Sequence, residues 1–213
     1  MSQPDARSRA SSSMISIHGT SAKAIAITFD DGPNPEFTPQ MLNIFSEEGG
    51  RATFYMTGDQ IERYPDTARL VHAAGHEIGN HSYSHPHLTE LEEEAIRAEL
   101  VRTSDIIRET VGVLPATFRP PYLATDAQVE RIAHDLGLAV IGGVNGAARD
   151  WDMPGAKHIL EASLAVTEPG SILVFHDGHG DRSQTVEAVR ELVRALKKEG
   201  YSFVTASELL QMD

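Results

Sequence analysis

The sequence contains no cysteine, a single tryptophan and few basic residues. Without cysteine, disulfides, thiolate metal ligands and a cysteine nucleophile are excluded, so any metal must be held by histidine and carboxylate side chains. Its 18 Lys and Arg residues against 31 Asp and Glu residues give a formal net charge of −13. Such a charge repels phosphate backbones and anionic lipid surfaces, so neither nucleic acid nor a membrane is an expected partner.

Long apolar runs are also missing. No stretch approaches the roughly 20 residues of a membrane-spanning helix, and the N-terminus lacks the apolar core of a signal peptide. Residues 1–22 are rich in serine, alanine and arginine without sustained periodicity, so we expect a flexible tail or linker there. Residues 23–213 are long enough for one domain with a large core, and their sequence leaves the oligomeric state open.

Apolar and β-branched runs recur along the chain and predict about seven strands. These runs lie at residues 24–29, 52–57, 76–80, 116–119, 138–144, 171–175 and 201–204. Helical patterns separate them, which is typical of an α/β fold with parallel strands, arranged either as an open doubly wound sheet or as a closed barrel.

The helical patterns have recognisable ends. Asp126 is expected to cap one helix that stops at Gly137. Thr89 and Glu92 have the spacing of a capping box and predict the start of the longest helix, which runs to about residue 111.

Five short polar motifs accompany the apolar runs. They are TFDDGP at residues 28–33, HSYSH at 81–85, RPPY at 119–122, DW at 150–151 and VFHDG at 174–178. Because the carboxyl ends of parallel strands meet at one rim, polar groups at those ends can gather around one site. The sequence has no glycine-rich motif of a nucleotide-binding loop.

Asp30 and Asp31 directly follow the first apolar run. Adjacent carboxylates on an extended chain face different directions, so one can hold a metal while its neighbour takes a proton from an attacking water. An ordinary strand-ending turn is the alternative interpretation, because Asp, Gly and Pro are common turn residues.

Two histidine pairs have a spacing of four residues. His81 and His85 follow a predicted strand, where a loop can direct both rings toward one ion. His72 and His76 straddle a predicted helix end, so we expect them to be structural. His87 is expected at the surface.

The remaining motifs are ambiguous when each is taken alone. Arg119 precedes two prolines that stiffen the chain up to Tyr122, or it forms a surface ion pair. Trp151 can line a polar site or belong to the core. His176, at the end of an apolar run, is suited to acid catalysis or to an ordinary structural hydrogen bond.

Taken together and in this order, the five motifs resemble the polysaccharide deacetylase family, also called the NodB-homology domain or carbohydrate esterase family 4. The resemblance covers residues 23–210, and the segment HDGHGDRSQTVEAV is similar to members that act on N-acetylglucosamine polymers. It implies a distorted (β/α) barrel, with residues 23–213 as the catalytic domain. The implied activity is hydrolytic release of acetate from an N-acetylated polysaccharide or oligosaccharide, either chitin-like or peptidoglycan. An O-acetyl xylan esterase and a catalytically silent carbohydrate-binding domain are the alternatives.

The resemblance also implies a cofactor and a base. One divalent metal ion, usually Zn²⁺ with Co²⁺, Ni²⁺ or Mn²⁺ as alternatives, would be held by Asp31, His81 and His85. Asp30 would remove a proton from the attacking water, and Arg119 would orient Asp30.

Further roles follow from the same resemblance. His176 matches the general acid, and Asp150 matches the carboxylate that orients it. The backbone N–H of Tyr122 would stabilise the oxyanion, and Tyr122, Trp151 and Val174 would contact the substrate.

The chain departs from the family pattern at two positions. Ala147 stands where an aspartate is common, and Leu123 stands where a glycine is usual after RPPY. We expect Ala147 to alter local support and Leu123 to reshape the substrate groove. The family implies a cell-envelope or secreted protein if the N-terminus has been trimmed, and a cytoplasmic one otherwise.

Overall fold

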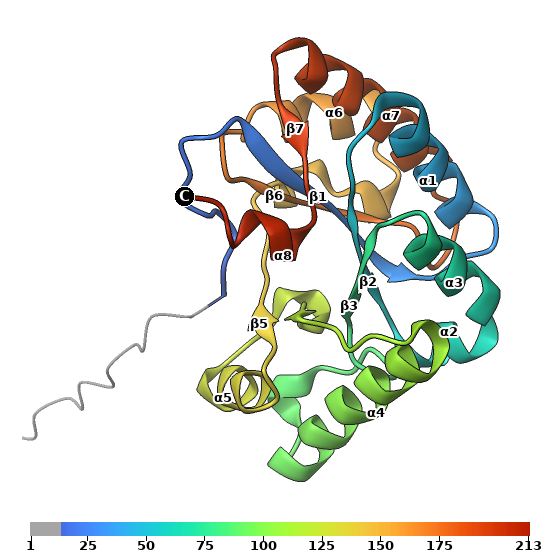
Figure 1. The fold of residues 1–213 in the computed structure, drawn as a ribbon, viewed down its shortest axis with the longest axis vertical. Helices are drawn as coiled ribbons and strands as arrows, with labels where there is room; N and C mark the ends of the chain where they lie inside the picture. Colours follow the sequence, from blue (N-terminus) through green and yellow to red (C-terminus); the bar gives the residue numbers. More distant parts are fainter. Residues whose placement is uncertain (1–13) are drawn as a thin grey trace, which may run out of the picture.

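A computed structural model describes residues 14–213, and within them the chain forms seven strands surrounded by helices (Figure 1). The strands are β1 (Ala24–Gly32), β2 (Thr53–Met56), β3 (Glu77–Asn80), β4 (Thr117–Phe118), β5 (Ala139–Val140), β6 (Ile172–His176) and β7 (Ser202–Phe203). All pair in parallel in the order β5-β4-β3-β2-β1-β6, and β7 pairs with the start of β1. The sheet curls into an incomplete barrel, which confirms the predicted α/β fold as a distorted (β/α) barrel.

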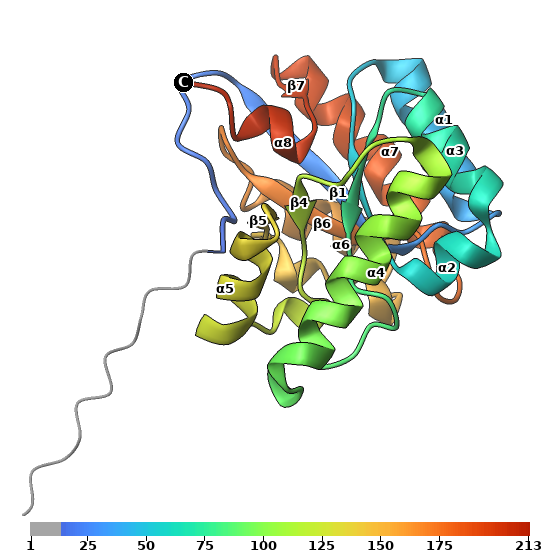
Figure 2. The ribbon, with the colours of Figure 1, turned by 60° about the horizontal axis from the view of Figure 1, so that its bottom comes forward.

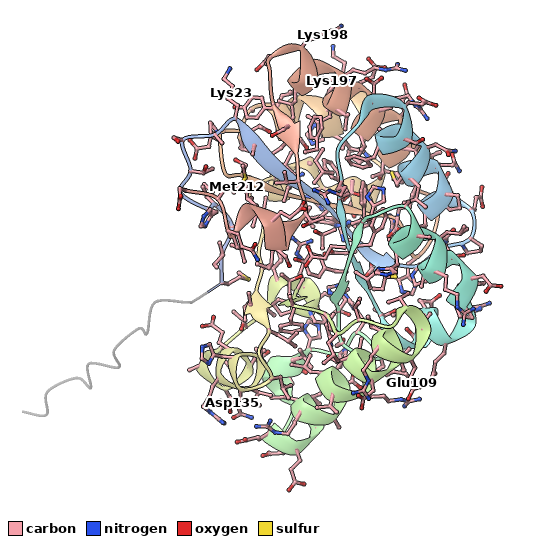
Figure 3. All side chains as sticks on the ribbon, in the orientation of Figure 1. Lys23, Glu109, Asp135, Lys197, Lys198 and Met212 are labelled. Carbon is pink, nitrogen blue, oxygen red and sulfur yellow. The ribbon has the colours of Figure 1, made fainter. Side chains whose placement is uncertain are left out.

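With one exception, the helices surround the sheet on its outer side (Figure 1). They are α1 (Phe37–Glu48), α2 (Gly58–Arg63), α3 (Pro65–Ala73), α4 (Glu93–Val111), α5 (Ala127–Asp135), α6 (Ala156–Leu164), α7 (Ser183–Lys198) and α8 (Ala206–Leu209). The short α8 is the exception, because its Leu209 packs with the inward-facing Ala24 and Ala26. Short 3₁₀ turns cover Leu88–Glu90, Pro121–Leu123, Gly146–Ala148 and Asp150–Asp152. Charged side chains project from the exposed sides of these helices, for example Glu109 of α4 and Asp135 of α5 (Figure 3). None of the helices among residues 14–213 is long and apolar enough to cross a membrane.

One predicted helix end is confirmed and another is wrong. The Asp126 carboxylate accepts hydrogen bonds from the backbone N–H groups of Gln128 and Val129, as expected of an N-cap. Thr89 does not cap α4, because it lies in a separate 3₁₀ turn and Glu92 precedes the helix without a side-chain cap. Leu88 explains the difference: its side chain is fully buried in the core, so the chain must turn there before α4 begins.

The alternation of β1 positions the site. Ile25, Ile27 and Phe29 belong to the apolar core shared with the outer helices, whereas Ala24 and Ala26 belong to a second cluster with side chains from β2, β6 and α8. Because side chains alternate along a strand, the residues that continue the Ala24 and Ala26 face are Thr28 and Asp30. A polar group therefore enters the barrel at the carboxyl end of β1.

Residues 14–22 are the described part of the segment predicted as a tail or linker, and residues 1–13 lie outside the described range. Ile15 bridges to Ile141 after β5, and Ile17 bridges to Ser171 before β6. The segment thus joins the two edge strands of the open sheet, and Figure 2 shows it beside β5. His18 Nε2 also lies 2.9 Å from the carbonyl oxygen of Met212, close to the C-terminus.

Candidate active site

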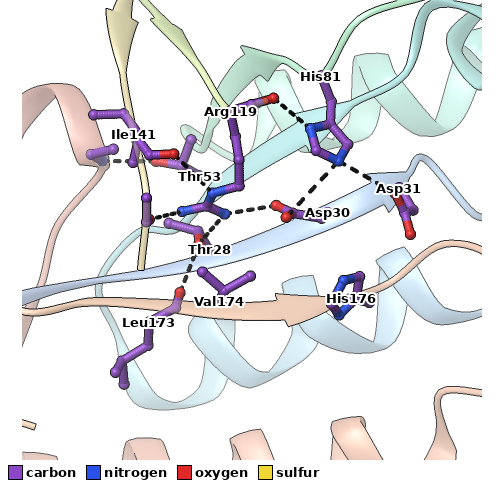
Figure 4. A network of polar contacts seen from close by, with 12 residues as sticks. Thr28, Asp30, Asp31, Thr53, His81, Arg119, Ile141, Leu173, Val174 and His176 are labelled. Atoms are coloured by element: carbon purple, nitrogen blue, oxygen red, sulfur yellow. Dashed lines mark hydrogen bonds and ion pairs between the residues drawn. The ribbon is translucent and has the colours of Figure 1, made fainter. Parts of the chain in front are cut away.

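A bulge at the end of β1 separates the two adjacent carboxylates. The register with β2 shifts between Asp30 and Gly32, and Asp31 has a left-handed backbone with φ of 71°. Asp30 continues the inward face of the strand, while Asp31 turns toward His81 (Figure 4). Asp31 also approaches His85, and Asp30 also faces Arg119. The two carboxylates nevertheless share His81, whose Nε2 lies 4.0 Å from Asp30 Oδ2 and 3.4 Å from Asp31 Oδ1.

Asp31, His81 and His85 form a site that suits a metal ion. One ligand atom from each lies within 4.8 Å of the others. Asp31 Oδ1 lies 3.4 Å from His81 Nε2 and 3.3 Å from His85 Nε2, and this buried oxygen has no hydrogen-bond partner among residues 14–213. A carboxylate oxygen and two imidazole nitrogens facing one point are a ligand set typical of Zn²⁺ and similar divalent ions.

The pKa values of Asp31 and His85 are shifted toward the forms that bind a metal. Burial alone would raise the pKa of Asp31, but the neighbouring imidazoles, His81 foremost, hold that pKa well below its usual range. His81 Nδ1 lies 2.7 Å from the Arg119 carbonyl oxygen. A carbonyl only accepts, so Nδ1 carries a proton and Nε2 is the nitrogen that faces Asp31. Burial lowers the pKa of His81, but the Asp30 and Asp31 carboxylates outweigh it and raise that pKa, so a cation would displace a proton from Nε2. Burial lowers the pKa of His85, which favours the neutral ligand form.

A fully buried guanidinium holds Asp30. Arg119 donates to Asp30 Oδ1 at 2.7 Å and to the Thr28 hydroxyl at 2.6 Å. That hydroxyl in turn donates to the Leu173 carbonyl, and the guanidinium lies 4.2 Å from the centre of the Tyr55 ring (Figure 4). The carbonyl oxygens of Ile141 and Gly142 accept its remaining hydrogen bonds. Asp30 is thereby paired and fixed in orientation.

His176 and Asp150 form a second buried pair. His176 Nδ1 lies 2.8 Å from Asp150 Oδ1, and the His176 backbone N–H donates to Asp150 Oδ2 at 2.8 Å. Burial disfavours the charged imidazole, but the hydrogen bond and charge of Asp150 outweigh it and raise the pKa of His176 to about 9. The Thr185 hydroxyl also donates to Asp150. His176 is therefore a proton donor at neutral pH with a fixed ring orientation.

These groups face one cleft of about 470 Å³. Its lining consists of Asp30, Asp31, His81, His85, Tyr122, Leu123, Trp151, Val174 and His176. Tyr122 and Trp151 are 59% and 47% exposed, so each offers an aromatic surface to a bound molecule. Arg119 and Asp150 lie behind this wall, where both are buried.

The structure thus brings every predicted site residue to one rim, as lining or directly behind it. Ala147 is exposed and does not line the cleft, whereas Leu123 does. His87, expected at the surface, is exposed and stacks on Tyr122 with ring centres 3.9 Å apart. His76 is structural, as expected, because its Nδ1 accepts the Ala52 N–H and burial lowers its pKa to about 4.

Sequence reasoning missed two supporting residues. Thr28 receives a hydrogen bond from Arg119, and its only signal was its place on the inward face two residues before Asp30. The side-chain amide of Asn145 pairs with the backbone of Val174 as a neighbouring strand would: its NH₂ donates to the Val174 carbonyl, and its oxygen accepts from the Val174 N–H. Nothing in the sequence around Asn145 indicated this contact, which fixes the wall of the cleft at Val174.

Known proteins resemble the chain over almost its whole length. The family model of polysaccharide deacetylases matches residues 18–141. A peptidoglycan-N-acetylglucosamine deacetylase of Bacillus cereus is 38% identical over 190 residues, covering 89% of each chain. A chitooligosaccharide deacetylase of Rhizobium leguminosarum bv. trifolii is 34% identical over 195 residues, covering 86% of this chain and 90% of that one.

The fold has a close counterpart among solved structures. A peptidoglycan N-acetylglucosamine deacetylase, solved in complex with a naphthyl-substituted N-hydroxybenzamide, superposes with a TM-score of 0.87 at 30% identity. The match covers 92% of this chain and 91% of that chain. With its fold, its sequence and its rim of motifs in agreement, the chain belongs to the polysaccharide deacetylase family.

Proposed function

We propose that the protein is a metal-dependent hydrolase that removes N-acetyl groups from N-acetylglucosamine units of a polysaccharide or oligosaccharide and releases acetate. The observation that carries this proposal is the convergence in one cleft of a carboxylate paired with a buried arginine, an Asp-His-His cluster and a histidine paired with a buried aspartate. Base, metal ligands and acid are the groups that metal-assisted amide hydrolysis uses.

Asp31, His81 and His85 are the proposed ligands of the cation, for which Zn²⁺ is the first candidate and Co²⁺, Ni²⁺ and Mn²⁺ are alternatives. When bound, such a cation supplies Lewis acidity, which polarises a carbonyl and makes water more acidic. Asp30 accepts the proton of the attacking water, and Arg119, which donates to Oδ1, keeps the carboxylate in place.

The opposite side of the cleft serves the leaving group. Attack on the acetyl carbonyl gives a tetrahedral oxyanion, toward which we assign the backbone N–H of Tyr122 as donor. An amine leaves poorly unless it is protonated, and His176 supplies that proton. Asp150 is the proposed positioning residue, because it accepts from both the ring and the backbone of His176.

The aromatic and apolar lining is suited to a sugar ring and an acetyl methyl. Trp151 lies edge-on to His176 with ring centres 5.5 Å apart, and Val174 lines the same cleft. We assign Trp151 and Val174 to the methyl group and the exposed ring of Tyr122 to the sugar. The named relatives favour peptidoglycan or chitooligosaccharide over other polymers.

Acetate release from three acetylated substrates tests the proposal. Purified protein loaded with zinc or cobalt should release acetate from N-acetylated chitooligosaccharides or peptidoglycan, and little from acetylated xylan. Release from xylan alone would assign the protein as an O-acetyl esterase. A protein that binds no divalent ion after loading and releases no acetate would be a silent carbohydrate-binding domain.

Replacing Asp150 by asparagine should move the alkaline limb of the activity to lower pH. The raised pKa of His176, about 9, means that the proton donor is present below that pH and is lost as the pH rises through it. Without the Asp150 charge, burial dominates and the pKa falls. A bound cation lowers the pKa in both proteins, so the shift between their pH profiles of kcat is the measurement. Coincident alkaline limbs would rule out His176 as the acid held by Asp150.

Leu123 should carry both a stability cost and a binding contribution. Its backbone is left-handed, with φ of 53°. Its side chain belongs to none of the apolar core clusters of residues 14–213 and lines the cleft instead. Leu123→Gly should be more stable than Leu123→Ala by about 1 kcal/mol, because only glycine relieves the left-handed strain. Both variants lose the same cleft-lining side chain, so both should change KM for chitooligosaccharides alike. Thermal unfolding and steady-state kinetics separate the two effects, and an altered KM in the glycine variant alone would contradict them.

A further inference from the structure

A glutamate outside every motif holds the loop that carries both histidines of the Asp-His-His cluster. Glu99, on α4, accepts hydrogen bonds through Oε2 from the backbone N–H groups of Tyr83 at 2.7 Å and Ser84 at 2.9 Å. Its Oε1 accepts from the Ser84 hydroxyl at 2.9 Å. One carboxylate thus receives three donors from two consecutive residues that lie between His81 and His85.

The loop needs such restraint because its backbone is unusual. Ser82 and His85 both have left-handed conformations, with φ of 64° and 56°. These conformations are costly for residues other than glycine and persist only where surrounding contacts enforce them. Other contacts also hold the loop: Asn80 Oδ1 accepts from the Ser82 N–H at 2.8 Å, the Gly58 N–H donates to the Ser82 carbonyl at 3.1 Å, and the Asp59 N–H donates to the Tyr83 carbonyl at 3.1 Å. Glu99 acts at its middle.

Helix α4 is a firm support for this contact. Ile96 and Leu100 bury its inner face in the core, and the Leu100 carbonyl accepts a hydrogen bond from Asn80 at 2.8 Å. Ser104, one turn further, also accepts from Asn80. The same helix therefore fixes the chain before His81 and, through Glu99, the chain before His85.

Glu99 is not an ordinary surface charge. None of the ion pairs formed by residues 14–213 includes it, and the side chain is half-buried. The three hydrogen bonds of its carboxylate all come from Tyr83 and Ser84, in the loop between His81 and His85. A charged acceptor of two backbone N–H groups is a strong anchor.

We propose that Glu99 is a positioning residue that sets the metal affinity of the site, by holding His85 at the distance from His81 that lets both rings face Asp31. The inference rests on the metal site of the proposed function. Partners outside the ligand set that orient the ligands commonly change metal affinity by about 10–100-fold when they are removed. The contribution of Glu99 acts through the loop, since it touches neither ring.

The metal affinity of purified apoprotein tests this, by competition for Zn²⁺ with a chelator. Glu99→Ala should bind Zn²⁺ about 10–100-fold more weakly than the unchanged protein. Glu99→Gln should recover most of the affinity, because the amide oxygen can accept from both backbone N–H groups while the NH₂ donates to the Ser84 hydroxyl. Glu109→Ala is the matched control: it removes the same charge from an exposed site on α4 (Figure 3) and should leave the affinity unchanged.

The visible spectrum of the Co²⁺-loaded proteins gives a second readout of ligand geometry. We expect a changed spectrum in Glu99→Ala, and the spectrum of the unchanged protein in Glu99→Gln and Glu109→Ala. Equal Zn²⁺ affinity in Glu99→Ala and the unchanged protein would overturn the inference. If the unchanged protein binds no more Zn²⁺ than His81→Ala, the metal site itself fails. Should Glu99→Ala not fold by circular dichroism, Glu99→Asp decides: its shorter side chain should weaken Zn²⁺ binding, and an unaltered affinity would again overturn the inference.

Discussion

Replacing Asp30 by asparagine should lower the rate of acetate release by about 10²–10⁴-fold, the contribution typical of a general base. Asparagine has the same shape and can keep the hydrogen bond from Arg119 through its oxygen, but it cannot take up a proton. Asp31, His81 and His85 are themselves unchanged in this variant, and only the 4.0 Å approach of the residue 30 side chain to His81 Nε2 is altered. The loss should therefore appear in kcat with little change in Zn²⁺ affinity.

Steady-state kinetics on chitooligosaccharides and a Zn²⁺ titration measure the two quantities separately. Asp31→Asn is the informative comparison, since the adjacent carboxylate should lose metal affinity as well as activity. Equal rates for Asp30→Asn and the unchanged protein would refute Asp30 as the base. A variant that loses metal and activity together would assign Asp30 to the ligand set instead.

Replacing Arg119 by methionine should destabilise the fold by about 3–5 kcal/mol, as expected when one partner of a buried ion pair is removed. The guanidinium is fully buried, and its loss leaves the Asp30 carboxylate without its countercharge. The carbonyl oxygens of Ile141 and Gly142 also lose their donors. Urea unfolding followed by circular dichroism measures the free energy of unfolding.

The matched test combines Arg119→Met with Asp30→Asn. If the unpaired Asp30 charge is the main cost, the double variant should be more stable than Arg119→Met alone, and the two effects should not add. Strict additivity would mean that the carbonyl acceptors and the packing against Tyr55, not the Asp30 charge, account for the loss.

The sequence predicts the frame of the site because parallel strands have a simple geometry. Strand-end motifs must meet at one rim, so the sequence alone is enough to group Asp30, His81 and His176. The alternation of β1 likewise explains why Asp30 enters the barrel. Periodicity could not predict the bulge that turns Asp31, because a bulge depends on the register with a neighbouring strand.

Contacts from distant elements were the other part that the sequence could not predict. Glu99 belongs to a run of charges on a helix, where a solvated face is the ordinary expectation. Its partners Tyr83 and Ser84 offer backbone N–H groups, which carry no residue-specific signal. The prediction that Thr89 caps α4 was wrong for a different reason. The local sequence has a capping pattern, but the burial of the neighbouring Leu88 places Thr89 in a separate turn.

Arg119 contacts both the proposed base and one proposed metal ligand. Its guanidinium contacts Asp30, and its own carbonyl accepts from His81 Nδ1. The base and one metal ligand are thus positioned by the side chain and the main chain of a single residue. Any displacement of β4 would alter both together.

The segment that bridges β5 and β6 also determines when the molecule can be completed during synthesis. Ile15 and Ile17 leave the ribosome before the strands of the sheet, yet their partners Ile141 and Ser171 emerge much later. Contacts between such distant parts of a chain form slowly, because a large loop must close first. The pairing of β1 with β6 beside Asp30 is delayed for the same reason, because β6 is made long after β1. A nascent chain that lacks β6 therefore has neither the neighbour of β1 nor His176 near Asp30, and we expect it to be inactive until β6 has been made.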